Sequence, residues 1–335
     1  KALGSSIRRL GLMNINLTVN NAIGLPVAEP VFDKILVDAP CSCEGTLRKS
    51  ANKVLPESGS NSTFMSNIQL SLLKKAFAVL KPGGSMVYST CTFSPEENEM
   101  VLDKMLHFAE GELTIEPIVL PGFEVSPGIT TWCGQQLDPC IRHAWRIWPH
   151  QNNTGGFFIA LLKKKDRGAS SVKSKAVYNS VDSSVADYIA EMQQRFAIDA
   201  DPLRKWQFLM PGKRGIFVTN ADNLALDPQF LPRVNFDSKG LFFLKTKISY
   251  PKLSSGGAML LGKHIKRHCV ELTADQVECY RQREDVSLAN HQLINCTSTG
   301  YVVVKYDNYY LGMGILFWRE GVDHMTMRSL FPKYL

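Results

Sequence analysis

Alternating β-type and α-type hydrophobic patterns restrict the fold of residues 1–165 more than any other feature of the chain. Short apolar runs near 32–37 and 85–90 alternate with segments at 66–80 and 94–108, in which apolar residues recur at helical spacing. Strands that alternate with helices are typical of an α/β domain with a mainly parallel sheet. We therefore predict such a domain over residues 1–165.

Local signals predict where the two helices end and begin. Pro82-Gly83-Gly84 should stop the first helix. Ser94 as N-cap, Pro95 in the first helical position and Glu97 two residues later form a capping box that should start the second. The polar stretch between Cys41 and Asn67 is expected to be a long loop, and long loops inside compact domains are usually functional.

The second half of the chain has a different character. Residues 166–182 are polar and weakly patterned, which indicates a linker. A helix then opens a domain over 183–335 that is rich in β-type runs and ends in a hairpin with an Asp307-Asn308 turn. The net charge is +7, and most of the excess falls after residue 165, with 22 Lys and Arg against 17 Asp and Glu. A basic second domain suggests a polyanionic partner, and a solvated lysine-rich surface is the alternative.

Composition excludes several classes of protein. With 44% hydrophobic and 21% charged residues and a mean hydropathy of −0.09, the chain is an ordinary folded protein. We find neither an apolar run long enough for a membrane span nor a secretory signal, so we expect a cytoplasmic protein. No Cys-x-x-Cys pair occurs, so we expect no structural zinc and no other metal site. Because no secretory signal is present, we expect the cysteines to be reduced thiols. The eight cysteines are Cys41, Cys43, Cys91, Cys133, Cys140, Cys269, Cys279 and Cys296.

Two of these cysteines stand directly after predicted strands. Cys41 follows Asp38 and Pro40 at the end of one strand, and Cys91 follows the next strand. Ligands bind outside the carboxyl ends of the strands in open α/β sheets, so the two thiols should face each other across one pocket if their strands are neighbours. A helix starting just after Cys91 would lower the pKa of its thiol. The other six cysteines have no such setting and are interpreted as core or surface thiols.

The segments DAPCSCEGTLRK and YSTCTFSPEENE resemble the two signature loops of the Sun/Fmu-type (Nol/Nop/Sun) RNA (cytosine-5)-methyltransferases. Flanking segments such as RRLGLMNINLTVNNA and RIWPHQNNTGGFFIALL are similar to the same family, so the resemblance covers about residues 5–165. It implies a Rossmann-like methyltransferase sheet and S-adenosylmethionine as cofactor. The end of the chain more weakly resembles the PUA-like RNA-binding domains of some members, which implies a smaller β-rich α+β domain.

The resemblance also implies residue roles. The family's Thr-Cys cysteine adds to carbon 6 of cytosine, which assigns the nucleophile to Cys91. The Pro-Cys cysteine assists release of the methylated RNA, which assigns that role to Cys41, while Pro40 would contact the RNA. Asp38 occupies the position that contacts the pocket between cofactor and base, and Asn21 the position expected near the adenine.

Two departures from the family concern the cofactor. No Gly-x-Gly motif precedes Asp38, whereas the family has a glycine-rich loop there. Asn21 replaces the usual aspartate, so its side-chain carbonyl could accept a hydrogen bond from the adenine amino group without carrying charge. We interpret the chain as N-terminally shortened, with the first strands of the sheet missing; a natural, cofactor-poor protein is the alternative.

Basic residues suggest where RNA would bind. Arg48 and Lys49 lie in the loop after Cys41, which could border the entry path of a flipped base; a surface loop without RNA contact is the alternative. The densest basic cluster of the second domain would contact phosphates, and it comprises Lys263, His264, Lys266, Arg267 and His268. Tyr306, Tyr309 and Tyr310 of the terminal hairpin are interpreted as packing residues rather than stacking platforms for bases.

These observations favour a monomeric methyltransferase that modifies carbon 5 of a cytosine in structured RNA through a covalent cysteine adduct. Ribosomal RNA is the favoured substrate, because the two-domain layout is similar to bacterial rRNA members, and transfer RNA is the alternative. A non-catalytic RNA-binding protein that retains the scaffold is the second interpretation. No membrane and no metal ion are expected to take part.

Overall fold

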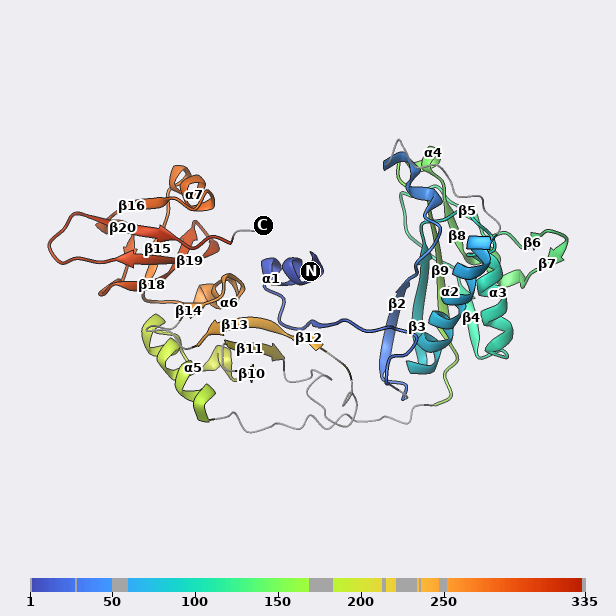
Figure 1. The fold of residues 1–335 in the computed structure, drawn as a ribbon, viewed down its shortest axis with the longest axis horizontal. Helices are drawn as coiled ribbons and strands as arrows, with labels where there is room; N and C mark the ends of the chain where they lie inside the picture. Colours follow the sequence, from blue (N-terminus) through green and yellow to red (C-terminus); the bar gives the residue numbers. More distant parts are fainter. Residues whose placement is uncertain are drawn as a thin grey trace. The chain divides into compact units, whose positions relative to one another are not determined.

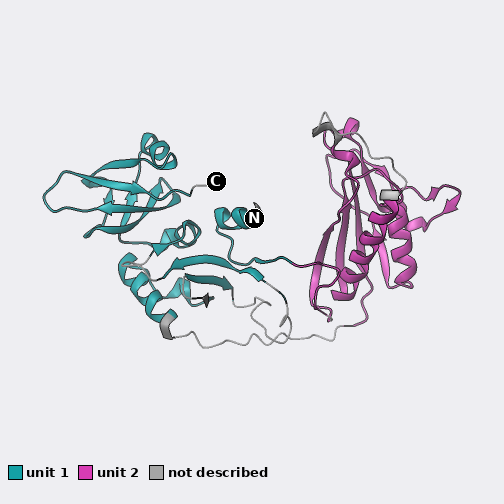
Figure 2. Ribbon diagram, viewed as in Figure 1, with its two compact units in different colours: residues 1–19, 174–335 teal, residues 20–173 magenta. Residues whose placement is uncertain are grey.

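The computed structural model of the chain describes residues 2–27, 29–49, 60–168, 183–212, 215–220, 234, 236–246 and 252–332. The chain forms two compact units (Figure 2), which we call unit 1 (residues 1–19 and 174–335) and unit 2 (residues 20–173). Most of the predicted linker 166–182 lies outside the described residues. Among the helices that the structure describes, none is both long and apolar enough to cross a membrane.

Unit 2 is built on a mixed sheet with strand order β2-β3-β9-β8-β5, in which β4 also pairs with β9 (Figure 1). Only β2 and β3 are parallel among its described pairings; the others are antiparallel. The prediction of a mainly parallel sheet was therefore wrong beyond β3, because β9 returns antiparallel beside it. The strands are β2 (Phe32–Asp38), β3 (Leu80–Thr90), β4 (Leu113–Glu116), β5 (Ser126–Pro127), β8 (Trp145–Ile147) and β9 (Phe157–Lys164).

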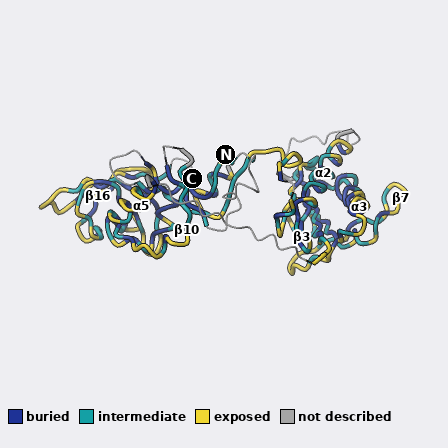
Figure 3. The backbone as a smooth tube through the Cα atoms, turned by 90° about the horizontal axis from the view of Figure 1, so that it is seen from below, coloured by how far each residue is buried: buried dark blue, intermediate teal, exposed yellow. Residues whose placement is uncertain are grey.

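Helices and short elements complete unit 2. The α-helices are α2 (Ser60–Val79), α3 (Glu99–Phe108) and α4 (Pro149–Asn152), and the 3-10 helices are η1 (Glu44–Lys49) and η2 (Pro139–His143). A small hairpin of β6 (Thr131–Trp132) and β7 (Gln135–Gln136) carries mainly exposed residues (Figure 3). The core of unit 2 includes fully buried side chains from α2, β3, α3 and β9, such as Leu73, Tyr88, Leu102 and Phe158.

Both predicted helices of unit 2 exist, but their first residues differ from the prediction. α2 begins at Ser60 rather than near Ser66, so the predicted loop from Cys41 to Asn67 is partly helical, with η1 as a second helical piece. The first four of the added residues 60–65 are serine, asparagine, serine and threonine, which gave no apolar periodicity to find. α3 begins at Glu99 instead of after Ser94, and the carboxylate of Glu97 bonds elsewhere, so the capping box was wrong.

Unit 1 contains two larger sheets with helices between and around them (Figure 1). One sheet has the order β10-β11-β13-β14 and the other the order β16-β20-β19-β18-β15-β17. Their strands are β10 (Trp206–Gly212), β11 (Gly215–Asn220), β13 (Leu241–Lys245), β14 (Lys252–Leu253), β15 (Cys269–Glu271), β16 (Asp285–Ala289), β17 (Leu293–Ile294), β18 (Gly300–Tyr306), β19 (Tyr309–Phe317) and β20 (His324–Ser329). The helices are α5 (Ser183–Phe196), α6 (Ser255–Leu261) and α7 (Ala274–Arg281), with short 3-10 helices η3 (Asp201–Leu203), η5 (Gly262–His264) and η6 (Asn290–Gln292).

The β-rich character predicted for residues 183–335 agrees with this architecture, while its PUA-like nature stays a prediction. β18 and β19 form the predicted hairpin, with Asp307 in the left-handed region at a φ of 51°. The tyrosines around the turn differ from one another. Tyr310 packs against a buried cluster, whereas Tyr309 is 68% exposed and Tyr306 is 37% exposed, so the packing interpretation was wrong for Tyr306 and Tyr309.

The first residues of the chain belong to unit 1, which differs from the sequence-based domain limit of 1–165. β1 (Asn16–Thr18) pairs antiparallel with β12 (Phe236–Lys239), and α1 (Ala2–Leu10) contacts α6. A Cβ atom on Gly256 of α6 would lie only 3.0 Å from the carbonyl of Arg8, so the absence of a side chain permits this close approach. The sequence could not reveal these contacts, since the partners lie far along the chain.

We predict that α1 is an integral part of unit 1. Ile7 is 4% exposed, and Ile7→Ala should lower the free energy of unfolding of unit 1 by about 2–5 kcal/mol through lost burial and the cavity left behind. Leu3→Ala is the matched control, because Leu3 is 61% exposed on the same helix and its loss should change little. Differential scanning calorimetry measures both effects, and equal small shifts for the two variants would show that α1 does not stabilise unit 1.

Candidate active site

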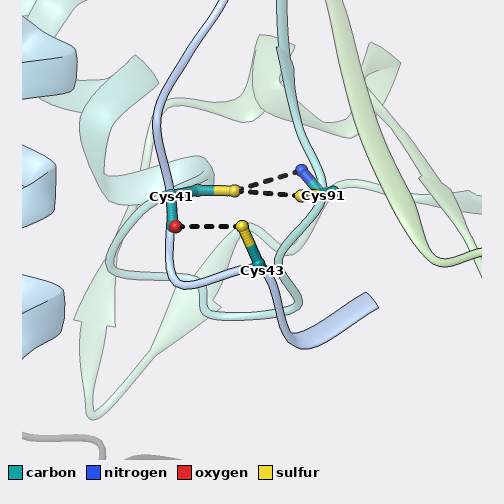
Figure 4. A group of neighbouring side chains, drawn as sticks. All are labelled: Cys41, Cys43 and Cys91. Atoms are coloured by element: carbon teal, nitrogen blue, oxygen red, sulfur yellow. Dashed lines mark hydrogen bonds between the residues drawn. The ribbon is translucent and has the colours of Figure 1, made fainter. Parts of the chain in front are cut away.

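Two thiols meet at the carboxyl ends of β2 and β3. The parallel register pairs Asp38 with Ser89, so the chain leaves both strands at the same level of the sheet. The Sγ atoms of Cys41 and Cys91 lie 3.3 Å apart, and the backbone N–H of Cys91 donates a hydrogen bond to Sγ of Cys41 at 3.3 Å (Figure 4). The predicted proximity of Cys41 and Cys91 is thereby confirmed, while their chemical roles stay predictions.

The electrostatic setting of these thiols differs from the prediction. α3 begins eight residues after Cys91, too far for the partial charges of its first turn to act on the thiol. Burial instead raises the pKa of Cys91 above its ordinary value, and burial together with the hydrogen bond to Cys91 raises that of Cys41 strongly. The expected lowering of the Cys91 pKa was therefore wrong.

A buried carboxylate connects the loop after β2 to the turn after β3. Glu97 has no exposed surface and accepts hydrogen bonds from the backbone N–H of Ser42 at 3.0 Å, from Gln69 Nε2 at 2.9 Å and from Ser62 Oγ at 3.2 Å. The same Gln69 nitrogen donates to the carbonyl of Pro40 at 2.8 Å. Because burying a carboxylate is costly unless it is hydrogen-bonded, these contacts fix Glu97 and both cysteine loops together.

A second carboxylate connects the loops from the other side. Oε2 of Glu44, in the first turn of η1, accepts hydrogen bonds from Thr92 Oγ1 and from the backbone N–H of Phe93, both at 3.0 Å. The hydroxyls of Ser42 and Thr92 lie 2.7 Å apart. Thr92 and Phe93, which follow Cys91, are therefore hydrogen-bonded to the residues on either side of Cys43.

The turn after Cys91 is also held by an ion pair inside unit 2. Arg146 of β8 bonds Glu99 through two nitrogens, each at 2.6 Å, and donates to the carbonyl of Phe93 at 3.0 Å. Both charged side chains are at most 5% exposed. Phe93 in turn stacks on Trp148 with ring centroids 4.9 Å apart. Such a planar contact through two nitrogens fixes the orientation of the Arg146 guanidinium as well as its distance from the Glu99 carboxylate.

Backbone atoms make the closest contact between the loops. The N–H of Gly45 donates to the carbonyl of Cys91 at 2.8 Å, and the N–H of Gly156 donates to the carbonyl of Gly45 at 2.9 Å. A Cβ atom on Gly45 would lie 2.9 Å from the Cys91 carbonyl and closer still to the carbonyl oxygen of Gly156. Only glycine fits at position 45 in this arrangement.

The residues expected near the cofactor lie beside a groove along β2. Asp38 is exposed and accepts a hydrogen bond from Ser89 Oγ at 3.3 Å. A cavity of about 410 Å³ runs from Asp38 along β2, with mostly apolar walls that include Ile35, Leu36 and Leu72. Asn21 is exposed too, but its side-chain oxygen accepts a hydrogen bond from the N–H of Ile23, so it is already engaged in a local turn.

The residues expected to touch RNA are divided between the two units. Pro40 is exposed beside Cys41 in unit 2, and the side chains of Arg48 and Lys49 lie outside the described residues. Lys263, Lys266 and Arg267 are in unit 1.

The basic cluster of unit 1 is smaller than the sequence suggested. Lys263 and Lys266 are exposed, Lys266 pairs with Asp199 at 2.7 Å, and Arg267 donates to Thr297 at 3.0 Å. His268 is only 3% exposed, and burial with the nearby arginines lowers its pKa to about 4, so it was wrongly included in the cluster.

Sequence reasoning missed several residues of the site. Cys43, interpreted as an ordinary thiol, lies beside the other two cysteines: the Sγ atoms of all three lie within 4.8 Å of one another. Glu97 was assigned to a helix cap, and Glu44 and Arg146 received no role. Acidic residues that closely follow a candidate nucleophile are the signal that could have pointed to Glu97.

Comparison with known proteins shows what the segment that carries this site is similar to. Residues 1–163 match the family model described as 16S rRNA methyltransferase RsmB/F. The ribosomal RNA small subunit methyltransferase F of Aeromonas salmonicida is 28% identical over 326 residues, which cover 94% of this chain and 62% of that protein. The tRNA (cytosine(49)-C(5))-methyltransferase of Pyrococcus abyssi is 35% identical over 160 residues, 48% of this chain and 50% of that protein. The chain thus spans less than two thirds of these relatives.

Among solved structures, NSun6 from Pyrococcus horikoshii with SFG is similar, at 34% sequence identity and a TM-score of 0.39. The similarity covers 48% of this chain and 37% of that protein.

We predict that Gly45→Ala destabilises unit 2, because the added methyl group must displace the backbone at Cys91 or Gly156. The expected cost is about 1–3 kcal/mol, as is typical of overpacking. Gly155→Ala is the matched control, since the nearest atom to a Cβ there, the Gly45 carbonyl oxygen, lies at an ordinary 3.5 Å. Thermal unfolding of the two variants decides the matter: equal melting temperatures would contradict the tight packing described here.

Proposed function

We propose that this chain methylates carbon 5 of a cytosine in RNA, because its residues 1–163 match the family model described as 16S rRNA methyltransferase RsmB/F. The observation that carries the proposal is the pair of thiols of Cys41 and Cys91, 3.3 Å apart at the ends of two neighbouring strands within the matched segment. A non-catalytic RNA-binding protein would need neither thiol, nor the hydrogen bonds through Glu97 and Glu44 that hold the two loops together.

The chemistry of cytosine explains why a thiol is needed. Carbon 5 is too weak a nucleophile to attack a methyl group on its own. Addition of the Cys91 sulfur to carbon 6 breaks the 5,6 double bond and makes carbon 5 an enamine-like nucleophile. Because burial raises the pKa of Cys91, its thiol must pass its proton to solvent water as the cytosine binds, before the sulfur adds to carbon 6. The base must also be unstacked, since a thiol on a loop cannot reach carbon 6 inside a helix.

Completion of the reaction restores the thiol. Once carbon 5 carries the methyl group, a proton acceptor removes the remaining proton from carbon 5. The 5,6 double bond of the cytosine then re-forms, and the bond between sulfur and carbon 6 breaks. Cys41 lies close enough to Cys91 Sγ to exchange a proton with it, which suits assistance at this release step. The distance between the two sulfurs does not show which of them attacks carbon 6. The assignment of attack to Cys91 and of release to Cys41 therefore rests on the positions of the Thr-Cys and Pro-Cys motifs.

The methyl donor of the family is S-adenosylmethionine, which supplies an electrophilic methyl group when bound. The exposed carboxylate of Asp38 could make one polar contact with this cofactor, because it lies three residues before Cys41 and beside the groove along β2. Asn21 fits less well than its sequence position suggested, since its oxygen already bonds Ile23. Together these residues offer part of a cofactor site.

Ribosomal RNA is the substrate class that we favour. The Aeromonas salmonicida relative, named as a ribosomal RNA enzyme, aligns with 94% of the chain and so includes most of unit 1. Relatives named as tRNA enzymes, from Pyrococcus abyssi and Drosophila melanogaster, align with 48% and 40%. We infer that unit 1 contributes to the choice of RNA, and Lys263, Lys266 and Arg267 are the candidates for phosphate contacts.

We predict different consequences for loss of the two thiols. Cys91→Ala should abolish both turnover and a covalent complex with RNA that contains 5-fluorocytosine, because the Thr-Cys motif assigns the addition to carbon 6 to this thiol. Cys41→Ala should still form the bond to ordinary RNA but release it slowly, leaving complexes that survive denaturation. Gel electrophoresis under denaturing conditions, with S-adenosylmethionine present, detects both outcomes. Normal turnover of Cys41→Ala together with adducts in Cys91→Ala would reverse the assignment, and no adduct in any form would favour the binding protein.

We also predict that the basic residues of unit 1 contribute to RNA affinity. Changing Lys263, Lys266 and Arg267 together to Glu should weaken binding and reduce its salt dependence. The log–log slope should fall by about 0.7–0.9 for each phosphate that these side chains no longer neutralise.

The control changes Arg204, Arg281 and Arg328 to Glu, which alters the net charge equally at other exposed positions of unit 1. Titration of RNA at several salt concentrations measures both triple variants. An equal effect of the two would mean that only net charge matters, and an unchanged slope would remove the cluster from the RNA-binding surface.

A further inference from the structure

The loops of the site bring together a third sulfur that methyl transfer does not use. Cys43 donates a hydrogen bond from Sγ to the carbonyl of Cys41 at 3.3 Å, and its sulfur lies within 4.8 Å of those of Cys41 and Cys91 (Figure 4). Within the part of the chain that the structure describes, no other three His, Cys, Asp or Glu side chains gather this closely. The mechanism above accounts for two of these thiols and leaves Cys43 without a function.

The backbone at Cys43 is held in a conformation that favours glycine. Its φ is +62°, in the left-handed region that costs a residue with a side chain about 1–2 kcal/mol. The carbonyl of Cys43 accepts hydrogen bonds from the backbone N–H and the hydroxyl of Thr46, at 3.1 Å and 2.8 Å, which stabilise the turn. Cysteine therefore occupies a position where glycine would be less strained, and the turn directs its sulfur back toward Cys41.

The spacing of the three sulfurs fits a single metal ion. Zinc binds thiolates at about 2.3 Å in a tetrahedral arrangement, which places the sulfurs around one ion about 3.8 Å apart. The observed separations, from 3.3 Å for Cys41 and Cys91 up to at most 4.8 Å, lie on both sides of that value. Small side-chain rotations would thus bring all three sulfurs to bonding distance, whereas two thiols alone would leave zinc under-coordinated.

We propose that Cys41, Cys43 and Cys91 form a binding site for Zn²⁺, with three thiolate ligands and a fourth position open to water or another ligand. Binding converts three thiols and one Zn²⁺ ion into a zinc–trithiolate and releases three protons to solvent. The site differs from the sequence-based expectation of no metal, because its ligands are a Cys-x-Cys pair and a distant cysteine rather than two Cys-x-x-Cys pairs. If the proposed methyl transfer is correct, zinc would also inhibit it, since the metal occupies both of its thiols.

Cadmium is the probe that tests the site, because it binds thiolates like zinc and gives an ultraviolet sulfur-to-metal charge-transfer band. Titration of the metal-free, reduced full chain with Cd²⁺ should show one tight site, and Zn²⁺ should displace the band. Cys43→Gly is the decisive variant, since it removes one ligand and suits the positive φ. It should keep or raise the melting temperature and weaken Cd²⁺ binding by at least about a hundredfold, because even loss of an outer contact to a metal ligand costs about 10–100-fold.

The control for this test is Cys133→Ser. Cys133 is exposed and also has a left-handed backbone, with a φ of 47°, but it lies outside the cluster. Its replacement should leave Cd²⁺ affinity unchanged. Equal affinity of Cys43→Gly and the unaltered chain, or a loss of affinity only in Cys133→Ser, would overturn the proposal. Formation of the RNA adduct, tested on metal-free protein, is independent of this result, so failure of one proposal is distinguishable from failure of the other.

Discussion

The parallel pairing of β2 with β3 determines where every other part of the site can lie. A parallel pair ends both strands at the same edge of the sheet, so two loops that are 50 residues apart in sequence begin side by side. A shift of register by one residue would turn the strand faces over and separate the thiols. The antiparallel return of β9 beside β3 completes this support, since Gly156, just before β9, is hydrogen-bonded to Gly45. The sheet therefore supplies the proximity of Cys41 and Cys91, and the loops only refine it.

Buried carboxylates fix the positions of the loops that carry Cys41 and Cys91. Glu97 and Glu99 have no exposed surface, and their hydrogen bonds connect α2 and β8 with the loops of the site. Glu97 bonds the loop of Cys41, and Glu99 holds Arg146, which binds the carbonyl of Phe93. A buried charge is tolerated only where its partners are in place, so each carboxylate makes correct loop geometry a condition of folding. The loops are in this way fixed by interactions from the core side.

The sequence was sufficient for the features that depend on local patterns and insufficient for those that depend on distant partners. Apolar runs ending in Asp38 and Ser89 indicated two strands, and the adjacency of Cys41 and Cys91 followed from them. The early start of α2 was hidden, because Ser60 and its neighbours are polar. The position of Cys43 could not be predicted either, because a left-handed turn at a non-glycine residue leaves no pattern in the sequence.

Because β1 pairs with β12, the two units become complete at different points during synthesis of this chain. Unit 2 is continuous, so all of its contacts are available once residue 173 has left the ribosome. Unit 1 is interrupted by unit 2, and β1 must wait for β12 and α1 for α6, which are made in the last third of the chain. Domains generally fold as soon as they are complete, so the order of folding here is the reverse of the order in which the two units begin. Until then, α1 lacks the contacts with α6 and β13 that it makes in the folded unit.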